Sequence, residues 1–230
     1  MQIIDVQGES VSLTDTILRL NLEPERYVPY HAGQYLQIQC LNEWLSYSIA
    51  NAPFTSKIYE VHLRHEAANP YHQAILSAIT EKRKLNIRLP FGDCTLEKLG
   101  KYPLIFIAAG TGFAPIKAMI EYEQIHNPLR SMELLWVIRS AKDLYMEALL
   151  QQWQSQLPHF SYACLYSSEL MKIQLLNKLQ SLHPSDLPRY HFVMAGPFDM
   201  VWSIYDALLG IGIQPSQLFS DAFSFPRGEK

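Results

Sequence analysis

The chain has 230 residues, of which 48% are hydrophobic and 18% charged, and its formal net charge is −3. This charge excludes a generally basic nucleic-acid-binding protein, because neutralising many phosphates requires an excess of lysine and arginine. An aromatic content of 12% excludes a disordered chain. The length suits one large domain or two modest ones.

The three cysteines, Cys40, Cys94 and Cys164, lie far apart in the sequence. They form no C-x-x-C or Cys–His spacing, so we expect neither a zinc site nor an iron–sulfur cluster. Such a sparse, odd number suits a reducing compartment. The longest apolar run, residues 104–109, is shorter than a membrane span, and no signal peptide is visible. We therefore expect a soluble, cytoplasmic protein with neither a membrane nor a nucleic acid as partner.

The first hundred residues show mostly the pattern of short strands. In residues 18–22 apolar and polar side chains alternate, which is typical of a half-buried strand. The strands that we predict here are residues 18–22, 35–40, 47–50, 58–63 and 85–89. Asn69 and Pro70 mark the start of one helix among them. Several short antiparallel strands with a single helix suggest a small β-barrel.

The pattern changes after about residue 100. Residues 104–108 are continuously apolar, as in a parallel strand buried on both faces. The strands predicted from here on are residues 104–108, 134–138, 162–166 and 191–195, alternating with helices at 115–123, 143–154, 169–182 and 200–209. This alternation predicts a doubly wound parallel sheet. We therefore expect two domains, residues 1–99 and 100–230.

The most informative motif directly follows the apolar strand at 104–108. It comprises Gly110, Thr111, Gly112, Phe113, Ala114 and Pro115, at the start of a predicted helix. Glycines here let the backbone turn sharply and approach a phosphate, and a helix N-terminus offers unpaired N–H groups to an anion. An ordinary strand-to-helix turn could use the glycines for geometry alone, but the strand before and the helix after favour a dinucleotide site.

Three further features are weak when taken singly. A second strand-to-helix turn holds Gly196, Pro197, Phe198 and Met200. Arg139 follows the second apolar strand, where a basic residue accommodates the 2′-phosphate of NADP. Arg139 thus favours NADPH, although a solvated arginine at a strand end explains it equally well. Tyr47 and Ser48, in the predicted barrel, are compatible with ordinary strand residues.

In their order along the chain, these motifs resemble the flavin reductases of the ferredoxin–NADP reductase superfamily, above all the bacterial NAD(P)H:flavin oxidoreductases. The residues that carry the resemblance are Tyr47-Ser48, His62-Leu63, Asn69, Tyr71, Pro90-Phe91-Gly92, the turn from Gly110 to Pro115, Arg139 with Asp143-Leu144-Tyr145, the turn from Ala195 to Met200, and residues 218–225. The resemblance covers nearly the whole chain. It implies a flavoprotein fold with an antiparallel flavin-binding barrel before an NAD(P)-binding domain.

The resemblance also implies the chemistry. Hydride would pass from C4 of NADPH or NADH to N5 of riboflavin, FMN or FAD, and the flavin could be a substrate rather than a bound group. Ser48 would be the catalytic residue, with its hydroxyl bonded near flavin N5. The cofactor-binding residues that the resemblance implies are Tyr47, Ser48, Ile49, Asn51, His62, Arg64, Tyr71, Gly92, Gly110, Thr111, Gly112, Phe113, Ala114, Pro115, Arg139, Gly196, Pro197, Phe198, Met200 and Phe223. No metal site is expected.

Two positions depart from the family pattern. Leu45 stands where the flavin motif begins with an arginine, so FMN and FAD should bind more weakly unless Arg64 compensates. Ala195 stands where many members of the superfamily carry a cysteine, but alanine occurs at this position in the flavin-reductase branch, so it supports the resemblance to that branch. Two alternatives remain open: an electron-transfer module with a prosthetic flavin that serves a partner protein, and a degenerate, non-catalytic nucleotide-binding protein. If the chain is instead a flavin reductase, as the resemblance implies, the reduced flavin would diffuse to its acceptor.

Overall fold

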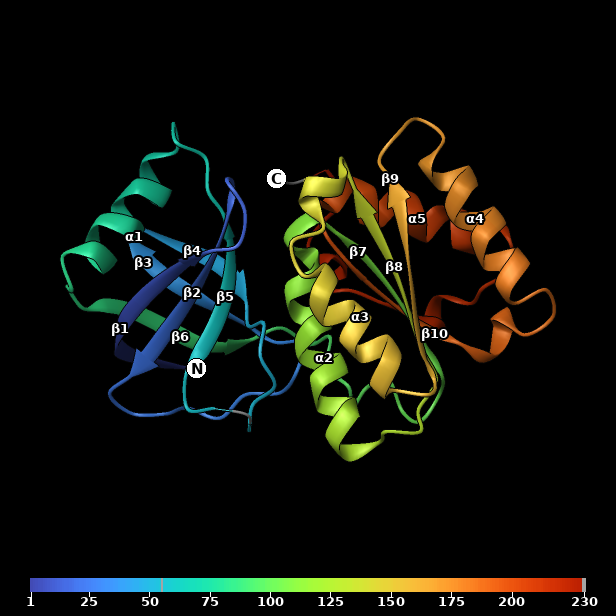
Figure 1. Ribbon diagram of the computed structural model, residues 1–230, viewed down its shortest axis with the longest axis horizontal. Coiled ribbons are helices and arrows are strands. Elements are labelled where there is room, and N and C mark those ends of the chain that lie inside the picture. The colour runs from blue at the N-terminus through green and yellow to red at the C-terminus, as the bar shows by residue number, and fades with distance from the viewer. Residues whose placement is uncertain (55, 229–230) are drawn as a thin grey trace.

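The computed structural model describes residues 1–54 and 56–228, which form two units lying side by side (Figure 1). The first is an antiparallel sheet with strand order β4-β3-β6-β1-β2-β5. Its elements are β1 (Gln2–Ser12), β2 (Ile17–Pro24), β3 (Tyr35–Cys40), β4 (Glu43–Ser48), β5 (Tyr59–Arg64), α1 (Pro70–Thr80) and β6 (Leu85–Phe91). A bridge between Ile49 and Val61 joins the two edges, so the sheet curls into a small barrel.

Helix α1 begins where the sequence predicts it. The side-chain oxygen of Asn69 accepts hydrogen bonds from the backbone N–H groups of Tyr71 and His72, at 3.0 and 3.3 Å. Pro70 occupies the first turn, where the missing N–H costs nothing. Ile75 and its apolar neighbours one turn later pack into the barrel core, which fixes the helix to the sheet.

Two strands of the barrel differ from the prediction. Strand β1 was not predicted, and it is central, pairing with both β2 and β6. Only Ile4 and Val6 are buried along it, so it lacks the hydrophobic alternation that marks a strand in the sequence. Strand β4 begins at Glu43 rather than at Tyr47, because its first residues pair with β3 although they are largely polar or only half-buried.

The second unit is a five-stranded parallel sheet with strand order β11-β10-β7-β8-β9. Its strands and helices are β7 (Leu104–Ala109), α2 (Phe113–His126), β8 (Met132–Ile138), α3 (Glu147–Gln156), β9 (Phe160–Tyr166), α4 (Met171–Leu182), β10 (His191–Ala195), α5 (Phe198–Gly210) and β11 (Leu218–Phe219). Helix α3 begins later than predicted, because Ser140 and Asp143 cap a separate 3-10 turn before it.

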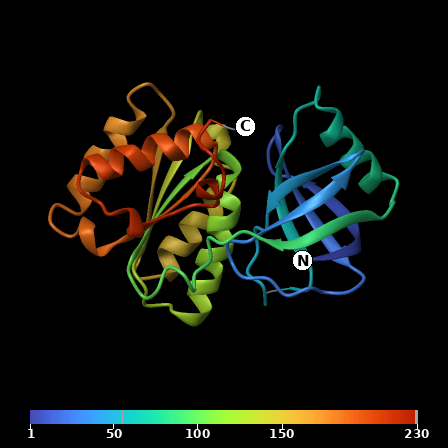
Figure 2. The same ribbon diagram turned by 180° about the vertical axis from the view of Figure 1, so that it is seen from behind.

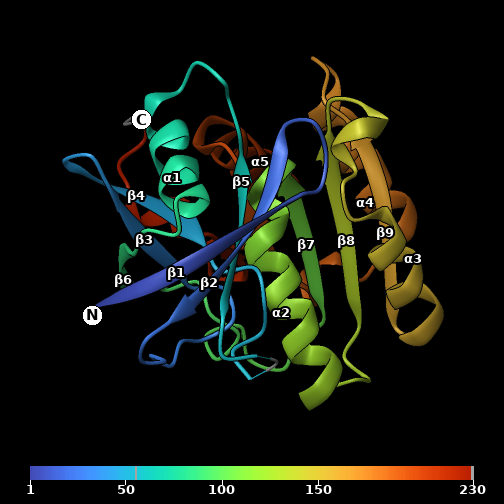
Figure 3. The same cartoon turned by 60° about the vertical axis from the view of Figure 1, so that its left-hand side comes forward.

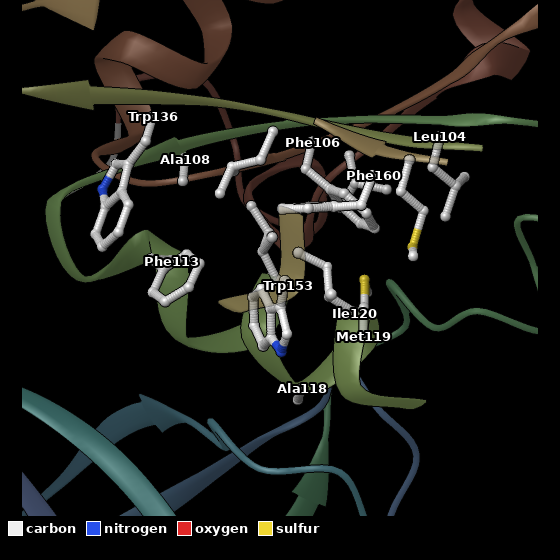
Figure 4. Close-up of a cluster of buried hydrophobic side chains, with 14 of the residues drawn as sticks. Leu104, Phe106, Ala108, Phe113, Ala118, Met119, Ile120, Trp136, Trp153 and Phe160 are labelled. Atoms are coloured by element: carbon white, nitrogen blue, oxygen red, sulfur yellow. The ribbon is translucent and has the colours of Figure 1, made fainter. Parts of the chain in front are cut away.

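Helices cover both faces of this sheet. On one face Phe106 packs with residues of α2 and α3, and Figure 4 shows Phe113, Trp136 and Trp153 together in this layer. On the other face Ile105 packs with residues of α4 and α5, which Figure 2 shows from behind. Neighbouring strand residues thus face opposite cores, which explains the continuous apolar run and confirms the doubly wound architecture.

Helix α2 lies on the side of the parallel sheet that faces the barrel (Figures 1 and 3). The chain passes from β6 to β7 over residues 92–103, and the division into residues 1–99 and 100–230 stays our proposal. Within the described residues, no helix combines the length and the apolar character that crossing a membrane requires.

Candidate active site

A cavity of about 540 Å³ opens between the two units. Residues of both units line it, and most of the predicted site residues are among them. The predicted residues that line this cavity are Tyr47, Ser48, His62, Arg64, Gly110, Thr111, Gly112, Ala114, Pro115, Arg139, Gly196, Pro197, Phe198 and Met200. The fold therefore brings the barrel motif, both glycine turns and Arg139 to one place.

Three predicted residues of the barrel lie outside the lining of this cavity. Ile49 is fully buried in the barrel core. The amide of Asn51 holds its own loop, donating to the carbonyl of Ile58 at 3.0 Å. Tyr71, in the first turn of α1, packs against the barrel core. Their roles in binding stay predictions, and the structure shows them supporting the segments that carry the site.

Three further predicted residues also lie away from this lining. Gly92 borders a second, smaller cavity of about 300 Å³. Phe113 is fully buried and stacks on Trp136, with 4.1 Å between ring centroids. Phe223 packs against Trp202 at the C-terminal segment. A ligand role for these three likewise stays a prediction.

The first glycine turn has the shape of a phosphate cradle. Gly110 has φ +53°, in the left-handed region that favours glycine. A Cβ on Gly112 would lie 2.2 Å from the carbonyl oxygen of Ala195, so the two predicted turns press against each other at this point. Helix α2 begins directly after the turn, and the N–H group of Phe113 already bonds to the carbonyl oxygens of Gly110 and Thr111. The unpaired N–H groups and the positive end of the helix dipole therefore lie in the turn itself, beside the cavity. These groups fit the phosphates of a dinucleotide.

Strand β4 turns its alternate residues toward different environments. Leu45 pairs with Ile38 and Tyr47 with Leu36, and directly opposed residues share one face of a sheet. Since Leu36 and Ile38 are buried in the barrel core, Leu45 faces that core and is absent from the cavity lining. Ser48 points the other way and lines the cavity. No described residue hydrogen-bonds to its hydroxyl, so that group is available to a ligand.

Strand β5 presents a row of three polar side chains to the second unit. Glu60, His62 and Arg64 alternate with apolar residues, so they project from one face. Glu60 Oε1 lies 3.2 Å from Lys117 Nζ of α2. His62 Nδ1 lies 2.9 Å from the hydroxyl oxygen of Tyr145, and Arg64 Nη2 lies 3.5 Å from a carboxylate oxygen of Asp143. This β5 polar row connects the two units beside the cavity.

The hydrogen bonds of His62 determine its tautomer. Its Nε2 lies 2.9 Å from Glu60 Oε1. An ionised carboxylate only accepts, so Nε2 carries the hydrogen and Nδ1 accepts from the Tyr145 hydroxyl. Burial alone would raise the pKa of Glu60, but the hydrogen bond from His62 and the charge of Lys117 lower that pKa to about 2. Burial lowers the pKa of His62, which is therefore neutral.

The buried neutral His62 predicts that stability depends on pH. The unfolded chain takes up a proton at His62 near its ordinary pKa, whereas the folded chain does so only at lower pH. The stabilisation is therefore present above about pH 6.5 and is lost as the pH falls below that value. When the pH is lowered from 8 to 5, the free energy of unfolding in urea should decrease. This group contributes up to about 1.4 kcal/mol of that decrease per pH unit.

In the His62→Gln variant this slope should be smaller. It should not vanish, because burial also lowers the pKa of His72 and His191. The exposed His159 offers the matched control, and His159→Gln should keep the wild-type slope. Equal slopes in His62→Gln and wild-type protein would contradict the assignment of a buried neutral imidazole.

Asp221 connects the C-terminal segment to the barrel. Its Oδ1 accepts hydrogen bonds from the backbone N–H groups of Asp93 and Cys94, at 3.0 and 3.1 Å. Burial raises the pKa of this carboxyl group. Asp221 borders both cavities. It lies within residues 218–225, which contribute to the family resemblance, but the sequence alone predicted no role for it.

Sequence reasoning missed Glu60, Lys117 and Glu121, which lie between the units. Lys117 is only 5% exposed. Its signal in the sequence is a single lysine within the apolar run of residues 113–120. In residues 1–54 and 56–228, no group of three or more histidine, cysteine or acidic side chains could hold a metal ion.

The chain is similar in sequence to known oxidoreductases. Residues 106–205 match the oxidoreductase NAD-binding domain. Reductase component 2 of terephthalate 1,2-dioxygenase from Comamonas sp. is 34% identical over 148 residues, which are 64% of this chain and 44% of that protein. The chain thus matches less than half of that relative's length. A probable flavin reductase from Photobacterium leiognathi is 25% identical over 241 residues, covering 97% of this chain and 99% of the relative.

Solved structures show the same fold. The ferredoxin NADP+ reductase from Neisseria gonorrhoeae, solved with bound FAD and NADP, superimposes with a TM-score of 0.76 at 17% sequence identity. That superposition covers 95% of this chain and 97% of the other. The chain is therefore similar to the oxidoreductase NAD-binding domain over residues 106–205, and nearly its whole length shares the fold of that ferredoxin NADP+ reductase.

Proposed function

We propose that this protein is an NAD(P)H-dependent flavin reductase that moves hydride from a reduced nicotinamide to a flavin. The observation that carries the proposal is the cavity of about 540 Å³ shared by Ser48 and the turn from Gly110 to Gly112. One cavity offers a free hydroxyl from the barrel and a phosphate cradle from the parallel sheet. The similarity to flavin reductases over almost the entire chain supports the same reaction.

The nucleotide and the flavin are bound by different residues, at opposite ends of the cavity. At the nucleotide end, the turn from Gly110 to Gly112 binds phosphate through backbone N–H groups, and Arg139 faces the 2′-phosphate of NADPH. At the flavin end, Ser48 donates its hydroxyl hydrogen and Tyr47 packs beside it. The nicotinamide and the flavin supply the redox chemistry, and the protein aligns them.

The side chain of Leu45 bears on which flavin is used. No arginine extends from this position, and Leu45 packs on the barrel core instead. Arg64 lies beside Gly110 and pairs with Asp143, at the nucleotide end of the cavity. The flavin phosphate therefore gains no charged partner from either residue. Riboflavin is accordingly a substrate at least as good as FMN, and the flavin exchanges freely.

A second function is favoured by a different observation. The relative from Comamonas is named as the reductase component of a dioxygenase, and this chain matches 44% of it. In this alternative the protein retains its flavin and passes electrons to a separate partner protein. The described cysteines, Cys40, Cys94 and Cys164, are free thiols. They support our inference of a reducing, cytoplasmic location.

Steady-state kinetics with three flavins and two nicotinamides tests the proposal. NADPH and NADH oxidation is measured with riboflavin, FMN and FAD. We expect turnover with free flavin and a kcat/KM for riboflavin at least equal to that for FMN. The purified protein should be colourless after gel filtration. A yellow protein without free-flavin turnover would favour the electron-transfer module, and a colourless protein inactive with every flavin would favour a non-catalytic nucleotide-binding protein.

A further inference from the structure

Helix α2 holds a charged side chain in a buried position. Lys117 is 5% exposed, and its ammonium group has three partners. Its Nζ lies 2.7 Å from Glu121 Oε1 on the same helix and 3.2 Å from Glu60 Oε1 on β5. It also donates to the backbone carbonyl oxygen of Ala50, at 3.1 Å. One buried ammonium thus contacts two separate segments of the barrel.

The segment that Lys117 contacts directly follows Ser48. The N–H group of Ala50 donates to the carbonyl of Glu60 at 2.7 Å, while the carbonyl of Ala50 accepts from Lys117. Two residues later, the N–H group of Ala52 donates to Glu121 Oε2 at 3.0 Å. Helix α2 therefore holds residues 50–52 through two of its side chains, one helical turn apart.

The same helix begins at the nucleotide turn. Residues Gly110–Gly112 lead directly into α2 at Phe113, and Lys117 lies about one turn further on. An α-helix is stiff over so short a distance, with about 1.5 Å of rise per residue. The positions of Ser48 and of the phosphate cradle are thus coupled through α2 and its contacts with the barrel.

We propose that Lys117 is a positioning residue that sets the location of Ser48 relative to the nucleotide turn. This inference rests on the proposed flavin reductase activity. A buried ion pair contributes little to stability beyond what an apolar side chain of similar volume provides. A geometric role explains why an ammonium group occupies this site. Hydride transfer is sensitive to such a role, because a misplacement of about 1 Å between reacting groups lowers a rate by up to about a hundredfold.

The test uses the Lys117→Met/Glu60→Gln double variant. Lys117→Met alone leaves the carboxylates of Glu60 and Glu121 without their cation and is expected to unfold at lower temperature. Glu60→Gln removes one of these charges. The double variant should recover much of the lost melting temperature, but the hydrogen bond from residue 117 to the carbonyl oxygen of Ala50 is still missing. We expect its hydride-transfer rate constant, from stopped-flow at saturating NADPH and riboflavin, to be about fivefold below wild type. The Kd for NADPH should stay within about twofold of the wild-type value.

The chain offers a matched control on the same helix. Glu123 pairs with Arg130 at 2.9 Å, also buried, and lies on a different face of α2 from Lys117 and Glu121. Glu123→Gln should lower the melting temperature yet leave the rate constant unchanged. Recovery of the wild-type rate by the double variant would show that Lys117 serves charge balance alone, and would overturn the proposal. An equal loss of rate in Glu123→Gln would overturn it too.

A second measurement separates this inference from the proposed function. Amide hydrogen exchange of residues 49–52 is followed in the ligand-free protein, with no flavin or nucleotide added. The double variant should exchange faster there than wild type, and Glu123→Gln should not. Unchanged exchange in the double variant would overturn the positioning role. If the double variant exchanges faster while the wild-type protein reduces no flavin, the positioning role holds and the failure lies in the proposed function.

Discussion

The Gly112→Ala variant is expected to bind NADPH at least about a hundredfold more weakly than wild type, a loss of about 2.7 kcal/mol. A Cβ at this position would lie 2.2 Å from the carbonyl oxygen of Ala195 and 2.8 Å from the backbone nitrogen of Gly196. Both contacts are with backbone, so one of the two turns must move by close to 1 Å. That movement distorts the phosphate cradle and the opposing turn together. Calorimetric titration with NADPH measures the loss.

Gly210→Ala provides the control for this substitution. Gly210 ends helix α5, and a Cβ there would meet nothing within 4 Å. Alanine in a helix is favoured over glycine by about 0.5–1 kcal/mol, so this variant should be at least as stable as wild type and bind NADPH equally well. Wild-type affinity in Gly112→Ala would contradict the close packing of the two turns as the basis of the nucleotide site.

The parallel sheet could be predicted from the sequence because its signals are local. The three central strands, β7, β8 and β10, are short apolar runs that are mostly buried, and each is followed by a helix. Strand β1 could not be predicted in this way. Only Ile4 and Val6 are buried along Gln2–Ser12, and the strand forms because β2 and β6 supply backbone partners on both sides. Such pairing partners lie distant in the sequence and leave no local pattern.

The residues of the candidate site also differ in whether the local sequence could predict them. Gly110, Gly112 and Gly196 could be predicted because strand ends in a parallel sheet meet at one edge, so a motif after each strand implies a shared location. Ser48 required the family resemblance, since a tyrosine and a serine are ordinary residues of a strand. Lys117 could not be predicted, because its partners Glu60 and Ala50 come from a different unit. Contacts between two units depend on how the units dock, which no local pattern encodes.

The positions of Leu45 and Arg64 refine the expected specificity. The resemblance raised the possibility that Arg64 replaces the missing arginine of the flavin motif. The structure places Arg64 against the nucleotide turn, where its Nη2 would lie 3.2 Å from a Cβ on Gly110. Arg64 is thus better placed to meet a nucleotide phosphate than a flavin phosphate. Recognition of the flavin should therefore rest on the ring system, and because all three flavins share that ring system, discrimination among them should be small.

The Ser48→Ala variant is expected to transfer hydride at least about tenfold more slowly, a cost of about 1.4 kcal/mol. Ser48 lies at the end of β4, lines the cavity and makes no hydrogen bond to a described residue. Its hydroxyl is therefore free to bond to the flavin near the atom that accepts the hydride, where it would hold the ring in place as negative charge builds up on the ring system. A hydrogen bond to a charged group is worth about 1.5–3 kcal/mol, so removing it accounts for such a loss. Stopped-flow reduction at saturating riboflavin and NADPH measures the rate constant directly.

The fold should survive this change, because alanine removes a single oxygen atom that stabilises no neighbouring residue. The melting temperature and the Kd for NADPH should thus match wild type, and the loss should fall on the rate constant alone. Ser48→Thr keeps the hydroxyl and should retain most of the rate. Ser10→Ala, on the exposed part of β1, should be indistinguishable from wild type. A Ser48→Ala rate constant equal to that of Ser10→Ala would remove Ser48 from the chemistry and leave the cavity with a nucleotide cradle but no catalytic hydroxyl.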